Sequence, residues 1–218
     1  MPAFETLITY SIAASILCIS PGPSNLYIMA RTMGQGHQAG RAAASGMALG
    51  SFIYVLATAL GIAAIFKYSP MAYVAIKVAG ACYLIYLGYS YIANAASHST
   101  DKPHLKHLAT PVIFKQSVIV ELTNPKTALF FLAFLPQFVD TTQGNVAFQL
   151  FVLGCIYAVI AFCSDLLVVF LSSQLGKWLM QHPLFVQWQE RISGSILLLL
   201  GGFILFEQWQ ESNDSPTN

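Results

Sequence analysis

Charged residues are scarce in this chain. Of its 218 residues only 9% are charged, whereas 56% are hydrophobic, and soluble domains carry roughly 25% charged residues. Because so few charges cannot cover the surface of a soluble domain of this length, the sequence predicts an all-helical protein that crosses a membrane several times. The net charge of +1 gives no basis for binding nucleic acid.

Several chemical motifs are also missing. The sequence contains no nucleotide-binding GxxxxGK[ST], zinc-protease HExxH or serine-hydrolase GxSxG motif, so we predict neither an enzyme nor a bound cofactor or metal. The four cysteines lie in apolar stretches without a CxxC motif and are expected to be small buried hydrophobic residues. His104 and His107 have no cysteine nearby, which favours a solvated loop over a metal site. The chain starts without a positively charged region, so the first apolar stretch is expected to be a retained helix.

Six apolar segments are long enough to span a bilayer, which takes about 20 residues. They run over about residues 4–33, 42–66, 71–93, 112–138, 147–175 and 192–209. The longest polar stretch, residues 94–111, is predicted to link two halves, about 1–95 and 112–210, of a single transmembrane domain covering residues 1–218. A polar connection is expected over 177–190.

Two of the six segments are interrupted by proline motifs about a hundred residues apart. The first motif reads Ser20-Pro21-Gly22-Pro23-Ser24-Asn25, and the second reads Thr123-Asn124-Pro125-Lys126. Proline removes a backbone donor and clashes with the preceding turn, so each motif is expected to break its helix. In lipid the freed backbone groups must be satisfied or face a water-filled cavity, and paired breaks of this kind indicate a binding site. Ordinary proline kinks are the alternative interpretation.

The two halves follow the same plan, since each has one broken segment followed by two plain ones. Three is an odd number of spans, so the second half faces the opposite way, which predicts inverted repeats that alternate between two states. The connections after the first, third and fifth segments contain or flank Arg31, Arg41, Lys102, Lys106, Lys115, Lys177 and Arg191. The other side has Lys67, so the positive-inside rule places both termini outside the cell.

Small residues recur in the second segment, and the end of the chain is polar. Ala42, Gly46 and Gly50 are spaced four residues apart, which favours close packing against another helix. Residues 211–218 are expected to form a disordered tail.

Four charged residues stand out inside the apolar segments, where a charge costs about 2.5–3.5 kcal/mol on insertion scales. They are Lys77, Glu121, Lys126 and Asp165. The long side chain of Lys77 could extend to the membrane interface without any further role. Glu121 and Lys126 flank the second break, which could bring them together as a structural salt bridge or as a gating or proton-linked pair.

Asp165 is the strongest single candidate because it lies in the middle of the fifth segment. Burial disfavours the charged form of a carboxylate, so this group could take up and release a proton or bind the ammonium group of a substrate. A helix–helix hydrogen bond or a salt bridge to Lys126 is the structural alternative.

The surroundings of the breaks favour a small zwitterionic ligand. Asn25 and Asn124 can each bind a carboxylate or an ammonium group. The helix that starts after each break offers unpaired N–H groups and a positive dipole end, which suit a carboxylate. The predicted substrate-binding residues are Pro21, Gly22, Pro23, Asn25, Asn124, Pro125, Lys126 and Asp165. The predicted proton-coupling or gating residues are Lys77, Glu121, Lys126 and Asp165.

Three groups of residues are characteristic when taken together. They are the first break with Gly34, Gly40, Gly46 and Gly50; Lys77-x-x-Gly80-x-x-Tyr83-Leu84-x-Tyr86-Leu87-Gly88; and Asn124-Pro125-Lys126 with Phe130, Phe131 and Pro136-Gln137-Phe138. Over about residues 10–140 this chain resembles the LysE/RhtB family, the lysine and homoserine/threonine exporters.

The resemblance implies a six-span exporter of amino acids or their derivatives in the inner membrane, driven by the proton-motive force, with homo-oligomer formation left open. Several members of the family carry an acidic residue in the second helix, where this chain has Ser51. The missing acid disfavours lysine or arginine and favours a neutral amino acid as substrate. The alternative functions are transport of another small solute or cation, and a non-transporting membrane scaffold.

Overall fold

A computed structural model describes residues 4–19, 22–62, 64, 69–94, 107–140, 144–181 and 183–214. Every regular element in these ranges is a helix, which confirms the all-helical prediction. The elements are α1 (Phe4–Ile19), α2 (Pro23–Gln35), α3 (His37–Ala57), η1 (Thr58–Ile62), α5 (Pro70–Asn94), α6 (Thr110–Leu122), α7 (Pro125–Leu129), η2 (Phe130–Phe134), η3 (Leu135–Phe138), α8 (Val146–Gln181) and α9 (Pro183–Asp214).

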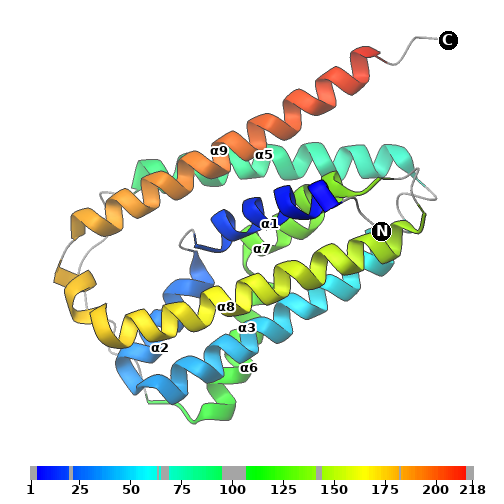
Figure 1. Ribbon diagram of the computed structural model, residues 1–218. Helices are drawn as coiled ribbons and strands as arrows, with labels where there is room; N and C mark the ends of the chain where they lie inside the picture. Colours follow the sequence, from blue (N-terminus) through cyan, green and yellow to red (C-terminus); the bar gives the residue numbers. More distant parts are fainter. Residues whose placement is uncertain are drawn as a thin grey trace.

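The helices form two packed groups (Figure 1). In one group α5 lies along α9, and in the other α3 packs against α2, α6 and α8. Helices α1 and α7 lie between the two groups, where α1 contacts α8 and α7 contacts α5 and α6. Elements from the two halves of the chain therefore pack against each other throughout the molecule.

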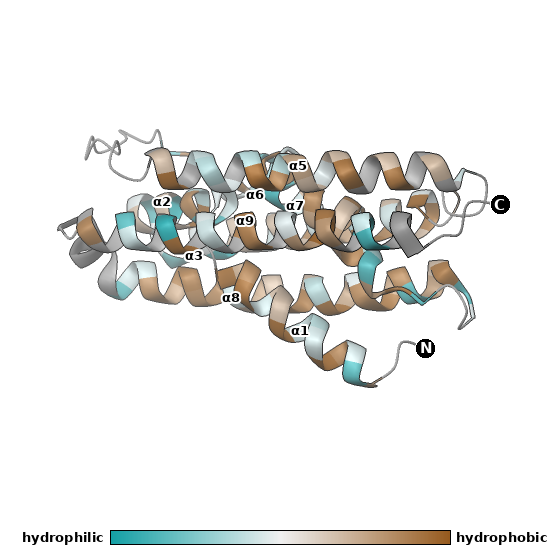
Figure 2. Ribbon diagram, turned by 90° about the horizontal axis from the view of Figure 1, so that it is seen from above, coloured by the Kyte–Doolittle hydropathy of each residue, from teal (hydrophilic) through white to brown (hydrophobic). Residues whose placement is uncertain are grey.

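The outside of the molecule is apolar. Large hydrophobic side chains that are more than half exposed include Ile12, Leu60, Val159, Phe170, Leu199 and Phe203. Figure 2 shows apolar residues along the length of α5 and α8. Such a surface is costly in water and suits contact with lipid tails.

Two helices in the described part are long and apolar enough to cross a membrane, namely His37–Ile62 and Val146–Gln174. Two bent pairs raise the number to four if each is one span: Phe4–Ile19 with Pro23–Gln35, and Thr110–Leu122 with Pro125–Phe138. Helices α5 and α9 contain shorter apolar stretches, Val78–Ser90 and Leu197–Gln210. The arrangement as six spans in two inverted repeats stays a prediction.

Glycines allow the helices to approach closely, as the spacing in the second segment predicts. A Cβ atom added at Gly46 would lie 2.6 Å from Cβ of Ser117, and one added at Gly50 would lie 2.7 Å from Cβ of Glu121. Both distances are too short for real atoms, so α3 can pack against α6 only with glycine at these positions. The α5–α9 contact is similar, because a Cβ at Gly201 would lie 2.7 Å from the carbonyl oxygen of Ala81.

The C-terminal region differs from the sequence prediction. Helix α8 continues to Gln181 and α9 begins at Pro183, so the polar connection expected over 177–190 is largely helical. The stretch that precedes Pro183 contains no glycine or proline after Gly176, and proline at a first helical position is well tolerated. Helix α9 also extends to Asp214, so the first part of the tail predicted to be disordered is helical.

Candidate functional site

A small polar pocket lies where the two helix breaks meet α8. Its lining comes from five elements and the residues beside them: Cys18, Gly22, Ser24, Asn25, Glu121, Asn124, Lys126, Thr127, Tyr157, Ala161 and Asp165. Five of the eight residues predicted to bind substrate line the pocket, and Pro23 and Pro125 lie directly beside lining residues in the sequence. Pro21 lies outside the described residues, and so does the side chain of Lys77 in α5.

The second break is built by proline and a capping amide. Helix α6 ends at Leu122 and α7 begins at Pro125, with the helix axes before and after the break inclined by 48°. The side-chain oxygen of Asn124 accepts a hydrogen bond of 3.0 Å from the backbone N–H of Lys126. This bond satisfies one of the donors that a helix start leaves unpaired.

At the first break, the helix that follows starts without a capping side chain. Helix α1 ends at Ile19 and α2 begins at Pro23, and their axes are inclined by 52°. The residue before α2, Gly22, has an extended backbone and provides no side-chain cap. The side chain of Lys126 lies against this glycine, since a Cβ added at Gly22 would be 3.4 Å from Lys126 Nζ. The start of α2 therefore faces a cation instead of a capping side chain.

The two breaks are joined directly to each other. The side-chain amide of Asn124 donates a hydrogen bond of 2.7 Å to Ser24 Oγ. Lys126 Nζ donates to the carbonyl oxygen of Leu17 at 2.9 Å, near the end of α1. Lys126 is only 4% exposed, so its side-chain nitrogen lies against backbone oxygen in the interior of the protein.

Glu121 is surrounded by hydroxyl groups from three other elements. Ser24 of α2 donates to Oε2, whereas Ser51 of α3 and Thr127 of α7 donate to Oε1 at 2.8 and 3.0 Å. Among the described residues, every hydrogen bond to the Glu121 carboxylate comes from a hydroxyl, and none comes from Lys126. The hydroxyl donors satisfy the hydrogen-bonding capacity of this buried side chain.

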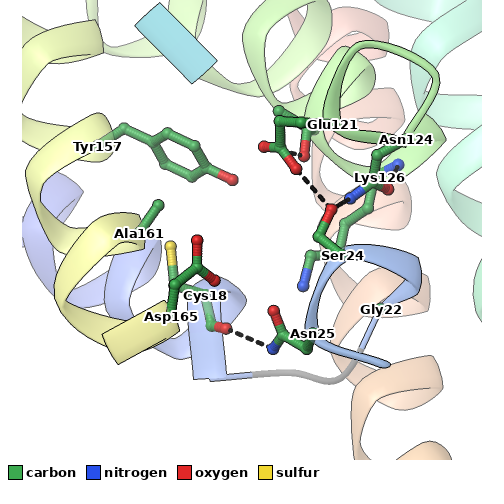
Figure 3. A pocket seen from close by; sticks show the side chains of 11 residues that line it. Cys18, Gly22, Ser24, Asn25, Glu121, Asn124, Lys126, Tyr157, Ala161 and Asp165 are labelled. Atoms are coloured by element: carbon green, nitrogen blue, oxygen red, sulfur yellow. Dashed lines mark hydrogen bonds between the residues drawn. The ribbon is translucent and has the colours of Figure 1, made fainter. Parts of the chain in front are cut away.

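Asp165 is buried without such partners. Its side chain is 7% exposed, and within the described part of the chain it makes neither a hydrogen bond nor an ion pair. Figure 3 shows its carboxylate pointing into the pocket from α8, opposite Asn25 and Lys126. The structural alternatives for Asp165, a helix–helix hydrogen bond or a bridge to Lys126, are absent from the described contacts.

Backbone oxygen atoms and aromatic rings complete the pocket. The carbonyl oxygen of Cys18 accepts hydrogen bonds from Asn25 Nδ2 at 3.3 Å and from Ser164 Oγ at 3.2 Å. Tyr157 is buried, and its ring stacks on Phe130 with a centroid separation of 4.0 Å. The phenol of Tyr157 faces the pocket in Figure 3, so this wall combines an apolar ring with a polar tip.

Four residues in or beside the pocket are not among the predicted site residues, namely Ser24, Ser51, Thr127 and Tyr157. Ser24 and Thr127 lie beside the predicted site residues of the two breaks, so their place in the motifs is a usable signal. Ser51 directly follows Gly50, the glycine that lets α3 approach Glu121. Tyr157 lies eight residues before Asp165 in the sequence, a spacing that places both on one face of a helix.

The pocket is small in this conformation. Its volume is about 20 Å³, roughly the room that one water molecule needs. Among the described residues, no group of three histidine, cysteine or acidic residues is placed to hold a metal ion.

Apolar helices broken around a buried polar pocket are typical of membrane transporters. The chain belongs to the LysE type translocator family, whose sequence pattern matches residues 15–208. This confirms the resemblance read from the motifs and extends it to α8 and α9. The protein is therefore a membrane transport protein and not an enzyme.

The chain is also similar to individual bacterial proteins. It is 30% identical to the leucine efflux protein of Salmonella typhimurium over 159 residues. This aligned region covers 71% of this chain and 73% of the relative. It is 29% identical over 205 residues to an uncharacterised membrane protein of Bacillus subtilis, which covers 90% of this chain and 97% of the relative. No solved structure matches the chain.

Proposed function

We propose that this protein is a secondary active exporter of amino acids across the inner membrane, driven by the proton-motive force. The observation that carries the proposal is the pocket between the two breaks, where the buried amine of Lys126 lies opposite the buried carboxylate of Asp165, which makes no hydrogen bond or ion pair among the described residues. A small zwitterion has the two charges that match these groups. The absence of a nucleotide-binding motif is consistent with energy from an ion gradient.

The proposed substrate is a neutral amino acid such as leucine. Leucine is the molecule named for a relative with 30% identity. Among the described residues of the pocket, Asp165 is the one carboxylate without a hydrogen bond, which leaves no second acid for the side-chain cation of lysine or arginine. Tyr157, Ala161 and Cys18 line the pocket and provide apolar surface for an aliphatic side chain.

The proposed membrane arrangement has six spans in two inverted halves, about 1–95 and 112–210, with both termini outside and residues 94–111 in the cytoplasm. The bends of 52° and 48° occur in corresponding places of the two halves, as expected for repeats. Alternating access would then open the pocket to one side at a time.

Transport can be tested with purified full-length protein in liposomes loaded with radiolabelled leucine. An inward proton gradient is expected to accelerate leucine efflux over that from protein-free liposomes, and unlabelled leucine outside should exchange with the label. The other neutral amino acids are tested in the same way. If no amino acid moves under any gradient, the proposal is wrong and a scaffold function is favoured.

A further inference from the structure

The pocket contains two buried carboxylates, and only one of them is available to a ligand. All acceptor contacts described for Glu121 are with the hydroxyls of Ser24, Ser51 and Thr127. Asp165 has no hydrogen bond or ion pair in the described part of the chain, although it is only 7% exposed. A buried carboxylate without a partner costs free energy unless it is protonated or meets a cation.

The opposite side of the pocket is positive. Lys126 Nζ lies beside Gly22, and α2 begins there without a side-chain cap. The start of α7 is different, because the side chain of Asn124 already accepts the N–H of Lys126. A substrate carboxylate would therefore find its donors at Lys126 and the start of α2, and not at the start of α7.

We propose that the ammonium group of the substrate binds Asp165 while its carboxylate lies against Lys126 and the start of α2, so that a proton and the ammonium group exclude each other at Asp165. This inference rests on the proposed function and specifies how its two ions are coupled. Protonation of Asp165 removes the negative charge that holds the ammonium group, which releases the substrate. Deprotonation restores the site, so the carboxylate carries either a proton or a substrate molecule.

Other titratable groups face the same pocket and must be separated from Asp165 in any test. They are Cys18 beside the end of α1, Glu121 of α6, Lys126 of α7 and Tyr157 of α8. The pocket residues Ser24 and Asn25 of α2 and the preceding Gly22 are neutral, and α3 contributes the Ser51 hydroxyl to Glu121. Glu121 is the main competitor because it is also a buried carboxylate.

Binding of radiolabelled leucine to purified protein in lipid nanodiscs, measured at a series of pH values, tests the competition. The apparent affinity of the wild-type protein should fall as the pH is lowered, by up to about tenfold per pH unit. Asp165→Asn should bind leucine weakly with no such dependence. Asp140→Asn is the matched control, because Asp140 is exposed and lies outside the pocket, and it should behave like the wild type.

Two leucine analogues test the orientation. Leucinamide lacks the carboxylate and 4-methylpentanoate lacks the ammonium group. Asp165→Asn should weaken the binding of leucinamide at least tenfold more than that of 4-methylpentanoate, and Lys126→Gln should show the opposite preference. Lys115→Gln, which changes an exposed lysine of α6, should alter neither.

The outcomes separate this inference from the function on which it rests. If the wild-type protein binds and exchanges no neutral amino acid, both are wrong. If it exchanges leucine but Asp165→Asn keeps the wild-type pH dependence, the competition at Asp165 is wrong and the proposed transport function stands. Loss of the pH dependence in Glu121→Gln but not in Asp165→Asn would transfer the role to Glu121.

Discussion

The two buried carboxylates of the pocket have the same chemistry and opposite surroundings. Glu121 lies at the end of α6 and accepts hydrogen bonds from α2, α3 and α7, whereas Asp165 faces the pocket from α8 without a described partner. A satisfied carboxylate that joins four helices stabilises one arrangement of those helices. A carboxylate without a described hydrogen bond can respond to a proton or a ligand, so we propose a structural role for Glu121 and a transport role for Asp165.

The largest expected effect is on transport by Asp165→Asn. Because the ammonium group loses a charged partner worth about 1.5–3 kcal/mol, leucine efflux should fall by about one to two orders of magnitude. The thermal unfolding temperature of the purified protein should not fall, since no described contact of Asp165 is lost. Full efflux activity in this variant would remove the transport role of Asp165.

Glu121→Gln should mainly lower the stability of the folded protein, in contrast to Asp165→Asn, which should mainly lower transport. The amide replaces one acceptor oxygen by a donor, which leaves at least one of the three hydroxyls without its partner. Loss of hydrogen bonds to a buried charged group costs about 1.5–3 kcal/mol. Thermal unfolding in detergent measures the effect beside Asp165→Asn, and an unchanged unfolding temperature would contradict the structural role.

The contact that brings α3 to Glu121 can be tested with a single methyl group. In Gly50→Ala the new Cβ would lie 2.7 Å from Cβ of Glu121, and such overpacking costs about 1–3 kcal/mol. Gly61→Ala is the matched control, because nothing lies within 4 Å of a Cβ added there. Thermal unfolding should separate the two variants, and equal unfolding temperatures would argue against close α3–α6 packing.

The smallest effect is expected from removing one hydroxyl. Ser51→Ala removes one of three hydrogen bonds to Glu121, and such bonds between membrane helices average about 0.6 kcal/mol. Ser173→Ala is the comparison, since the hydroxyl of Ser173 is exposed and donates to its own helix at Phe170. If Ser51→Ala were destabilised as much as Glu121→Gln, the stabilisation of Glu121 would depend on Ser51 and would not be shared among the three hydroxyls.

The sequence allowed the general position of the site to be predicted, for identifiable reasons. Proline has strong local effects, so helix ends near Pro23 and Pro125 follow from their position in apolar segments. Charges are rare in such segments, which singles out Glu121, Lys126 and Asp165. These residues all line the pocket, although their functions stay predictions.

The partners of these charges could not be predicted. Hydroxyls in apolar helices often bond to their own backbone, as Thr32 does with Ile28 and Ser117 with Ile113. Nothing in the local sequence shows that Ser51 bonds instead across to α6. The asymmetry between the helix starts at Pro23 and Pro125 also depends on side-chain direction, which only coordinates reveal.

The most direct test of the account measures proton movement together with leucine. Liposomes containing purified protein and a trapped pH-sensitive dye are loaded with leucine and diluted into leucine-free buffer. Leucine leaving the liposomes should drive protons inward through the wild-type protein and Asp140→Asn, whereas Asp165→Asn should move no protons under the same gradient. Leucine-dependent proton uptake by Asp165→Asn at the wild-type rate would contradict the central claim.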